Sequence, residues 1–131
     1  MAQSSNNLDK HILIIDDDIY ASEMYSISLK DAGYQVDIAR DGDSGYKMMQ
    51  QNHYDVVLLD IMLPRVNGEH VLEKWRNNHP KGTKPPIIIM TNYEQSEAAK
   101  APVVSSSDYY AIKASITPSE LRNLIARALE I

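Results

Sequence analysis

The sequence predicts an α/β domain in which helices cover both faces of a parallel sheet, with five strands in the order 2-1-3-4-5. Short apolar segments alternate along the chain with segments of helical periodicity. Strands and helices that alternate in this way form parallel sheets through right-handed crossovers. The length of 131 residues, 44% of them hydrophobic, matches one compact domain with a single core.

Five segments fit strands because they are short, rich in β-branched or aromatic residues, and bounded by polar or turn-forming residues. We expect these strands at residues 12–15, 35–39, 56–59, 87–90 and 109–112. Residues 1–9 are polar and show no periodicity, so we expect a flexible leader ahead of a folded domain at residues 10–131.

The first helix follows the first strand, and Gly33 stands where a helix should end. Tyr20, Tyr25 and Tyr46 are expected to pack helices against the sheet. The helical spacing also predicts a sheet-facing side made of Ala21, Met24, Tyr25, Ser28, Leu29 and Ala32.

Further helices fit the stretches between the remaining strands. Residues 43–52 and 68–78 have helical character, and a short or irregular helix is expected from Glu94. Thr117 and Glu120 have the spacing of a capping box, which predicts the start of the last helix.

Composition excludes several classes of function. The net charge is −5 and the pI is about 5.2, so no basic field favours nucleic acid as a direct partner. Cysteine is absent, which excludes disulfides, zinc–thiolate sites and cysteine nucleophiles. Because neither a membrane-length apolar run nor a signal peptide is apparent, we expect a soluble cytoplasmic protein.

Polar residues follow four of the predicted strands. Asp16 and Asp17 follow the first, Asp60 the third, Thr91 the fourth and Lys113 the fifth. The carboxyl ends of parallel strands lie at one edge of the sheet, where doubly wound domains bind ligands between strands 1 and 3. We therefore expect these side chains to form one site.

The chemistry of these residues favours a cation and a phosphoryl group. Clustered carboxylates repel each other unless a cation joins them, and an all-oxygen site suits Mg²⁺. One carboxylate is then available as a nucleophile that forms an aspartyl phosphate, while the metal, a hydroxyl and an ammonium neutralise the phosphoryl oxygens. Asp18, the third acid in the run, is expected to begin the first helix instead.

The ordered set of motifs resembles the response-regulator receiver domain of two-component signalling, a CheY-like family with a flavodoxin-like fold, over residues 10–131. Its acidic pair, its phosphoacceptor motif D-x-x-x-P-x-x-[DN]-G, its hydroxyl residue, its switch aromatic and its lysine all have counterparts. In order, these are Asp16 and Asp17; Asp60, Pro64, Asn67 and Gly68; Thr91; Tyr110; and Lys113.

The resemblance implies roles for the site residues. Asp60 accepts the phosphoryl group, and the Mg²⁺ ligands, or those of Mn²⁺ in its place, are Asp16, Asp17, Asp60 and the main-chain carbonyl of Met62. Thr91 and Lys113 bind phosphoryl oxygens. Movement of Thr91 lets Tyr110 turn inward, which changes the face formed by helix 4, strand 5 and helix 5.

The resemblance also implies partners. They are a sensor histidine kinase or phosphotransfer protein and a downstream protein target. The acidic net charge and the lack of a membrane-length apolar run predict neither direct nucleic acid contact nor membrane insertion. The sequence does not decide whether the chain forms a homodimer on phosphorylation. The chain is expected to catalyse only its own phosphorylation and dephosphorylation within a phosphorelay.

The sequence departs from the family pattern at two positions near the site. The proline that usually follows the lysine is Ala114, so the Lys113–Ala114 peptide is either trans or a strained cis bond. Asn92 replaces the small residue that usually follows Thr91. These departures support an alternative, a pseudo-receiver that binds proteins without phosphotransfer.

A stand-alone Mg²⁺-dependent phosphatase or NTPase is a further alternative. It has little support because no phosphate-binding glycine loop occurs and Met62 replaces the acid that aspartate-based phosphatases need two residues after the nucleophile.

Overall fold

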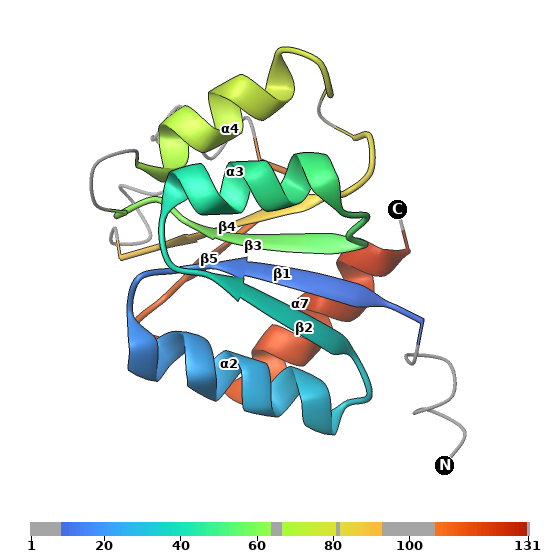
Figure 1. The fold of residues 1–131 in the computed structure, drawn as a ribbon. Helices are drawn as coiled ribbons and strands as arrows, with labels where there is room; N and C mark the ends of the chain where they lie inside the picture. The colour runs from blue at the N-terminus through green and yellow to red at the C-terminus, as the bar shows by residue number, and fades with distance from the viewer. Residues whose placement is uncertain (1–8, 64–66, 81, 93–106, 131) are drawn as a thin grey trace.

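The computed structural model describes residues 9–63, 67–80, 82–92 and 107–130. Five parallel strands form one sheet in the order β2-β1-β3-β4-β5, which confirms the predicted fold class and topology (Figure 1). The expected helix from Glu94 and the motif residue Pro64 lie outside the described residues. In chain order the elements are β1 (His11–Ile15), α2 (Ile19–Asp31), β2 (Gln35–Ala39), α3 (Gly42–Gln51), β3 (Val56–Asp60), α4 (Gly68–Arg76), β4 (Ile87–Thr91), β5 (Tyr109–Ile112) and α7 (Pro118–Leu129).

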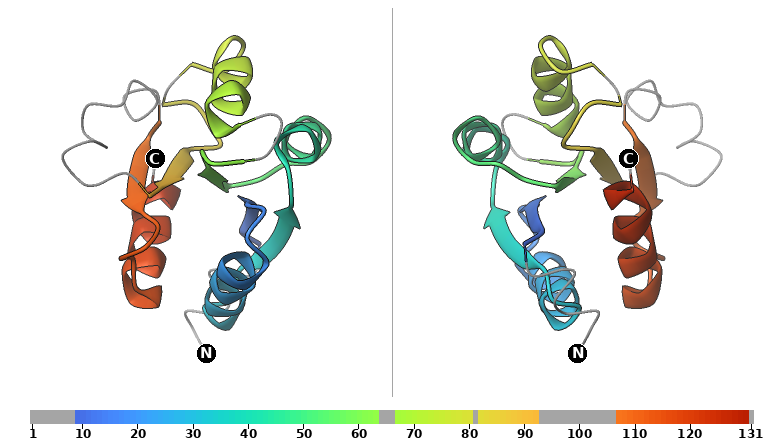
Figure 2. Two further views of the ribbon diagram at one scale, coloured as in Figure 1. Left: turned by 90° about the vertical axis from the view of Figure 1, so that its left-hand side faces the viewer. Right: turned by 90° about the vertical axis from the view of Figure 1, so that its right-hand side faces the viewer.

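The sheet lies between two layers of helices. α3 and α4 cover one face, and α2 and α7 cover the other (Figures 1 and 2). Alternate residues of β1 enter different cores: Leu13 and Ile15 pack with α3 and α4, whereas Ile12 and Ile14 pack with α2 and α7. Because both faces are buried, the central strands are apolar at nearly every position. No helix in the described ranges has the length and apolar character needed to cross a membrane.

The helix ends follow the sequence signals. Asp18 caps α2 by accepting a hydrogen bond of 3.1 Å from the Ala21 N–H, as predicted. At α7, Thr117 Oγ1 accepts from the Glu120 N–H at 3.1 Å, and Glu120 Oε1 accepts from the Thr117 N–H at 2.9 Å. This reciprocal pair is the predicted capping box.

Two residues expected to pack against the sheet from α2 are exposed instead. Met24 is 57% exposed and Tyr20 is 87% exposed, whereas Ser28 is buried as predicted and Ser22, which the pattern did not include, is buried as well. The buried serines are tolerated because their hydroxyls are paired: Ser22 Oγ donates to the Ile19 carbonyl, and Ser28 Oγ accepts from Arg122 at 2.8 Å. Tyr25 and Leu29 are buried as predicted, and the exposed apolar residues of the helix are Ile19, Tyr20, Met24 and Ile27.

A buried ion pair fixes the amino ends of β4 and β5. Arg76, the last residue of α4, donates from Nη2 to Asp108 Oδ2 at 2.9 Å, and both side chains are largely buried. Asp108 also accepts from the Ile87 N–H at 2.7 Å and the Gly82 N–H at 3.1 Å. One carboxylate therefore joins α4, the loop before β4, and the start of β5.

We expect Asp108→Ala to lower the free energy of unfolding by about 3–5 kcal/mol, because Arg76 would keep a buried charge without its carboxylate. Urea unfolding measures this loss. Asp43→Ala, an exposed change in the first turn of α3, serves as the control and should cost less than about 1 kcal/mol. Similar losses in the two variants would show that the buried ion pair contributes no more to the free energy of unfolding than an exposed acid does.

Candidate functional site

The carboxyl ends of four strands bring the predicted site residues to one edge of the sheet. Asp16 follows β1, Asp60 ends β3, Thr91 ends β4 and Lys113 follows β5. The carboxyl ends of these strands lie at the left of the sheet in Figure 1. Ile15 lies opposite Leu59 in the β1–β3 ladder, so Asp16 and Asp60 are adjacent. The Lys113 N–H donates to the Thr91 carbonyl at 2.7 Å and extends the β4–β5 ladder to the same edge.

The Lys113 ammonium joins the two buried carboxylates. Lys113 Nζ donates to Asp16 Oδ1 and to Asp60 Oδ2, both at 3.0 Å. Asp16 and Asp60 are only 1% and 3% exposed. Two main-chain groups also donate to these carboxylates: the Asp18 N–H to Asp16 Oδ1 at 2.8 Å, and the Met62 N–H to Asp60 Oδ1 at 2.9 Å.

Burial and charge pairing change the proton affinities of this group. Burial raises the pKa of Asp16 above its ordinary value, although the Asp18 N–H and Lys113 work in the opposite direction. Burial alone would lower the pKa of Lys113, but the hydrogen bonds to Asp16 and Asp60 outweigh it and raise that pKa above its ordinary value. One ammonium thus serves two carboxylates, and Asp16 is incompletely compensated.

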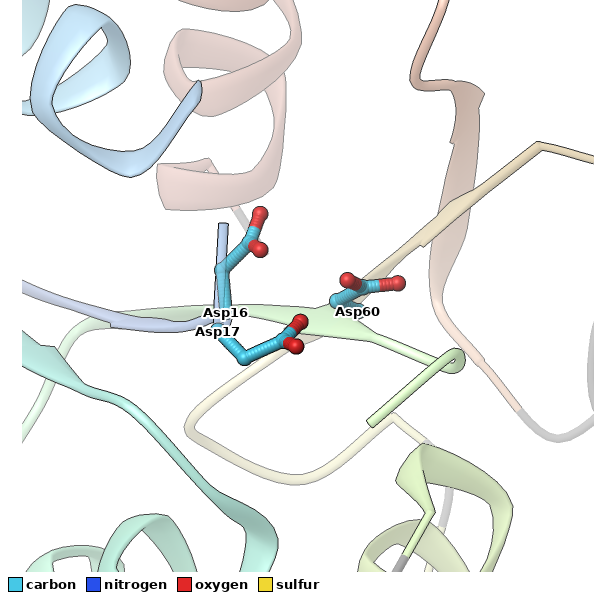
Figure 3. A group of neighbouring side chains, drawn as sticks. All are labelled: Asp16, Asp17 and Asp60. Atoms are coloured by element: carbon cyan, nitrogen blue, oxygen red, sulfur yellow. The ribbon is translucent and has the colours of Figure 1, made fainter. Parts of the chain in front are cut away.

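The acidic residues fit an oxygen-liganded cation. One carboxylate oxygen each from Asp16, Asp17 and Asp60 lies within 4.8 Å of the others (Figure 3). Asp17 is exposed, whereas Asp16 Oδ2 is buried and has no hydrogen-bond partner among the described residues. A buried, unpaired carboxylate oxygen is unfavourable, and a hard divalent cation would satisfy it. The donor set is therefore suited to Mg²⁺.

A close main-chain contact explains why the motif D-x-x-x-P-x-x-[DN]-G ends in glycine, here Gly68. A Cβ atom at this position would lie 2.3 Å from the Asp60 carbonyl oxygen and 2.5 Å from the Ile61 Cα. The Gly68 N–H donates to the Ile61 carbonyl at 3.1 Å, and Asn67 caps α4 by accepting from the His70 N–H at 3.0 Å. The start of α4 can therefore lie against the main chain of Asp60 only without a side chain at residue 68.

The remaining predicted site residues lie around this centre. Thr91 is fully buried at the end of β4, and Asn92 next to it is exposed. Tyr110 is half-buried and packs against the core on the α3–α4 face. Among the described residues only Lys84–Pro85 is cis, so the Lys113–Ala114 peptide is trans, and the lysine still reaches both carboxylates.

Sequence reasoning missed two contributions to the site. The N–H groups of Asp18 and Met62 orient the carboxylates, but they belong to the backbone, which no residue type reveals. Tyr25 of α2 is buried close enough for the charges of Lys113 and Asp16 to act on it. Burial raises the pKa of Tyr25 to about 12, so its hydroxyl stays protonated at neutral pH.

Residues 12–126 match the family model described as the response regulator receiver domain. The transcriptional regulatory protein DltR of Streptococcus agalactiae is 36% identical over 116 residues, which cover 88% of this chain and 49% of DltR. The response regulator ArlR of Staphylococcus saprophyticus is 33% identical over the same share of each protein. The chain thus spans about half the length of these curated relatives.

Solved structures show the same similarity. The response regulator TrrA from Thermotoga maritima, in complex with Mg²⁺-BeF, superposes with a TM-score of 0.79 at 30% identity and covers 92% of this chain and 99% of its own. A CheY-like receiver domain protein from Methanospirillum hungatei gives a TM-score of 0.78 at 28% identity, with 92% of this chain and 94% of its own covered.

The raised pKa of Asp16 predicts how Asp16→Asn changes stability with pH. The folded state holds the Asp16 proton more tightly than the unfolded chain, so the contribution of Asp16 to stability falls as the pH rises through the raised pKa. We therefore expect metal-free Asp16→Asn to be more stable than the parent at about pH 7, with a smaller difference at about pH 4. Urea unfolding with EDTA at both pH values tests this, and a difference that grows on acidification would contradict it.

We expect Gly68→Ala to destabilise the protein by about 1–3 kcal/mol, because the new methyl group would overlap the main chain of Asp60 and Ile61. Urea unfolding measures the loss. His70→Ala changes an exposed side chain in the same helix and should cost about 0.5 kcal/mol or less. Equal stability of the two variants would mean that the start of α4 shifts to make room for the methyl group.

Proposed function

Because the chain belongs to the response regulator receiver domain family, we propose that it is a signalling switch that accepts a phosphoryl group on Asp60. One observation carries this proposal: Asp60 is buried, yet its carboxylate is held between the Lys113 ammonium and the Met62 N–H, beside two further acids. A buried nucleophile that is oriented and paired with a cation suits phosphoryl transfer. The phosphoryl donor is a sensor histidine kinase or a phosphotransfer protein.

In the transfer step, a carboxylate oxygen of Asp60 attacks the phosphorus of a phosphohistidine. The P–O bond forms as the P–N bond breaks, and the imidazole leaves with the bonding electron pair. Lys113 is placed to neutralise charge on the phosphoryl oxygens, and the Met62 N–H keeps the carboxylate in one orientation. The product is an acyl phosphate on Asp60.

The residues proposed to hold Mg²⁺, or Mn²⁺ in its place, are Asp16, Asp17, Asp60 and the main-chain carbonyl of Met62. When bound, the cation supplies positive charge beside the transferring phosphoryl oxygens. The carboxylate geometry and the unpaired Asp16 Oδ2 support this assignment. The TrrA structure, which contains Mg²⁺-BeF, supports the choice of cation.

Phosphorylation is proposed to act through Thr91 and Tyr110. The hydroxyl of Thr91 binds a phosphoryl oxygen, and the movement that follows favours an inward orientation of Tyr110. The changed face around β5 and α7 then recruits a downstream protein or a second copy of the chain. The net charge of −5 argues against direct nucleic acid contact by this chain, although longer relatives are transcriptional regulators.

The decisive experiment is the intact mass of the protein after incubation with acetyl phosphate and Mg²⁺. We expect the mass of one phosphoryl group to be added to the native chain but not to Asp60→Asn, and EDTA to abolish the addition. Lys113→Ala should slow labelling by about 100-fold, as expected when one transition-state donor is lost.

Asp43→Asn is the matched control because this exposed acid lies in α3 and should be labelled like the native chain. Equal labelling of the native chain and Asp60→Asn would refute Asp60 as the phosphoacceptor. No labelling of the native chain would favour the pseudo-receiver alternative.

A further inference from the structure

The outer side of α2 carries an unusual concentration of exposed apolar side chains. Four of the five large apolar residues that are exposed in the described part of the chain belong to this one helix. They are Ile19, Tyr20, Met24 and Ile27, with exposed fractions of 55%, 87%, 57% and 62%. Figures 1 and 2 show α2 at the outside of the sheet, with no described helix or strand beyond it. We call these four residues the α2 stripe.

Helix geometry places the centre of the α2 stripe directly away from the sheet. Tyr20 and Ile27 are seven residues apart and share one side of the helix, while Tyr25 and Leu29 on the opposite side are buried. Met24 lies beside the same line. Apolar residues at positions i, i+4 and i+7 on an exposed helix face are typical of a helix that packs against another helix.

Two charged residues beside Ile27 point to the partner. Glu23 and Lys30 are both exposed, are also seven residues apart, and flank Ile27 on the same side. They lie about 10 Å apart along the helix, too far to pair within one chain. In an antiparallel pair of identical helices, however, residues at the same flanking position face each other, and Glu23 of one copy meets Lys30 of the other twice.

We propose that α2 is a self-association surface, at which a second copy of this chain packs its own α2 antiparallel about a two-fold axis that passes between residues 26 and 27. Ile27 then packs beside Ile27 of the second copy near the axis. Glu23 and Lys30 form two equivalent ion pairs at the border of the contact. In this register the surface is self-complementary in charge, as an isologous interface requires.

The size of this contact sets the expected strength. α2 has 13 residues and is about 20 Å long, so the pair buries less than the roughly 1,200 Å² of a standard stable interface. We therefore expect a reversible dimer with a dissociation constant of about micromolar or weaker. The contact uses neither the metal site nor the phosphoacceptor, so it stands or falls separately from the proposed function.

Sedimentation equilibrium of the 131-residue chain, with EDTA and without a phosphoryl donor, tests the proposal over a range of protein concentrations. We expect a monomer–dimer equilibrium that Ile27→Asp weakens by about tenfold or more, since a charge would enter the centre of the contact. Glu23→Lys should also weaken it, by placing like charges opposite each other. The double variant Glu23→Lys/Lys30→Glu should restore the native affinity.

Lys47→Glu reverses an exposed charge on α3, on the other side of the sheet, and should leave the affinity unchanged. Because all of these positions are exposed, circular dichroism should show native folding in every variant. A chain that is monomeric at every concentration overturns the proposal and leaves the α2 stripe to a different protein partner. A dimer that Ile27→Asp does not weaken, or whose Glu23→Lys defect the second change does not repair, also overturns it.

Discussion

The site depends on the Lys113 ammonium group, which holds two buried carboxylates together. Asp16 follows β1 and Asp60 ends the adjacent strand β3, and because both carboxylates are almost fully buried, their charges would repel strongly. Lys113 comes from the far side of β4, and its long side chain reaches both carboxylates at 3.0 Å. The strand order β2-β1-β3-β4-β5 is what makes this meeting possible, since residues 16, 60 and 113 are remote in the chain.

In the same arrangement the negative charge of the Asp16 carboxylate is only partly balanced by neighbouring groups. Asp16 is buried with one oxygen unpaired among the described residues, and burial raises its pKa. This is unfavourable for folding, but it keeps an oxygen available for a cation. The amino end of the sheet is different: at Asp108 each carboxylate oxygen has hydrogen-bond donors, and the group serves stability. The candidate site and the Asp108 ion pair thus lie at opposite ends of the sheet.

The sequence predicted the class and order of the elements because each depends on local signals. The apolar run at residues 12–15, the cap at Asp18 and the pair Thr117 and Glu120 specify their structures through neighbouring residues alone. The packing side of α2 was predicted less well. Periodicity placed Ser28 inward correctly, but it also placed Met24 inward, which is exposed, and it missed the buried Ser22. The Ser22 hydroxyl is paired within α2, whereas the Ser28 hydroxyl is paired with Arg122 from a distant helix.

The sequence by itself therefore determined the doubly wound fold and the set of chemical groups at the carboxyl edge, because strand ends and residue types are local properties. Only the tertiary structure decided how those groups are joined. It aimed Lys113 at both carboxylates without a following proline, supplied the Asp18 and Met62 N–H donors, and showed why residue 68 has no side chain. These features depend on distances between segments that meet only after folding, and no single segment encodes them.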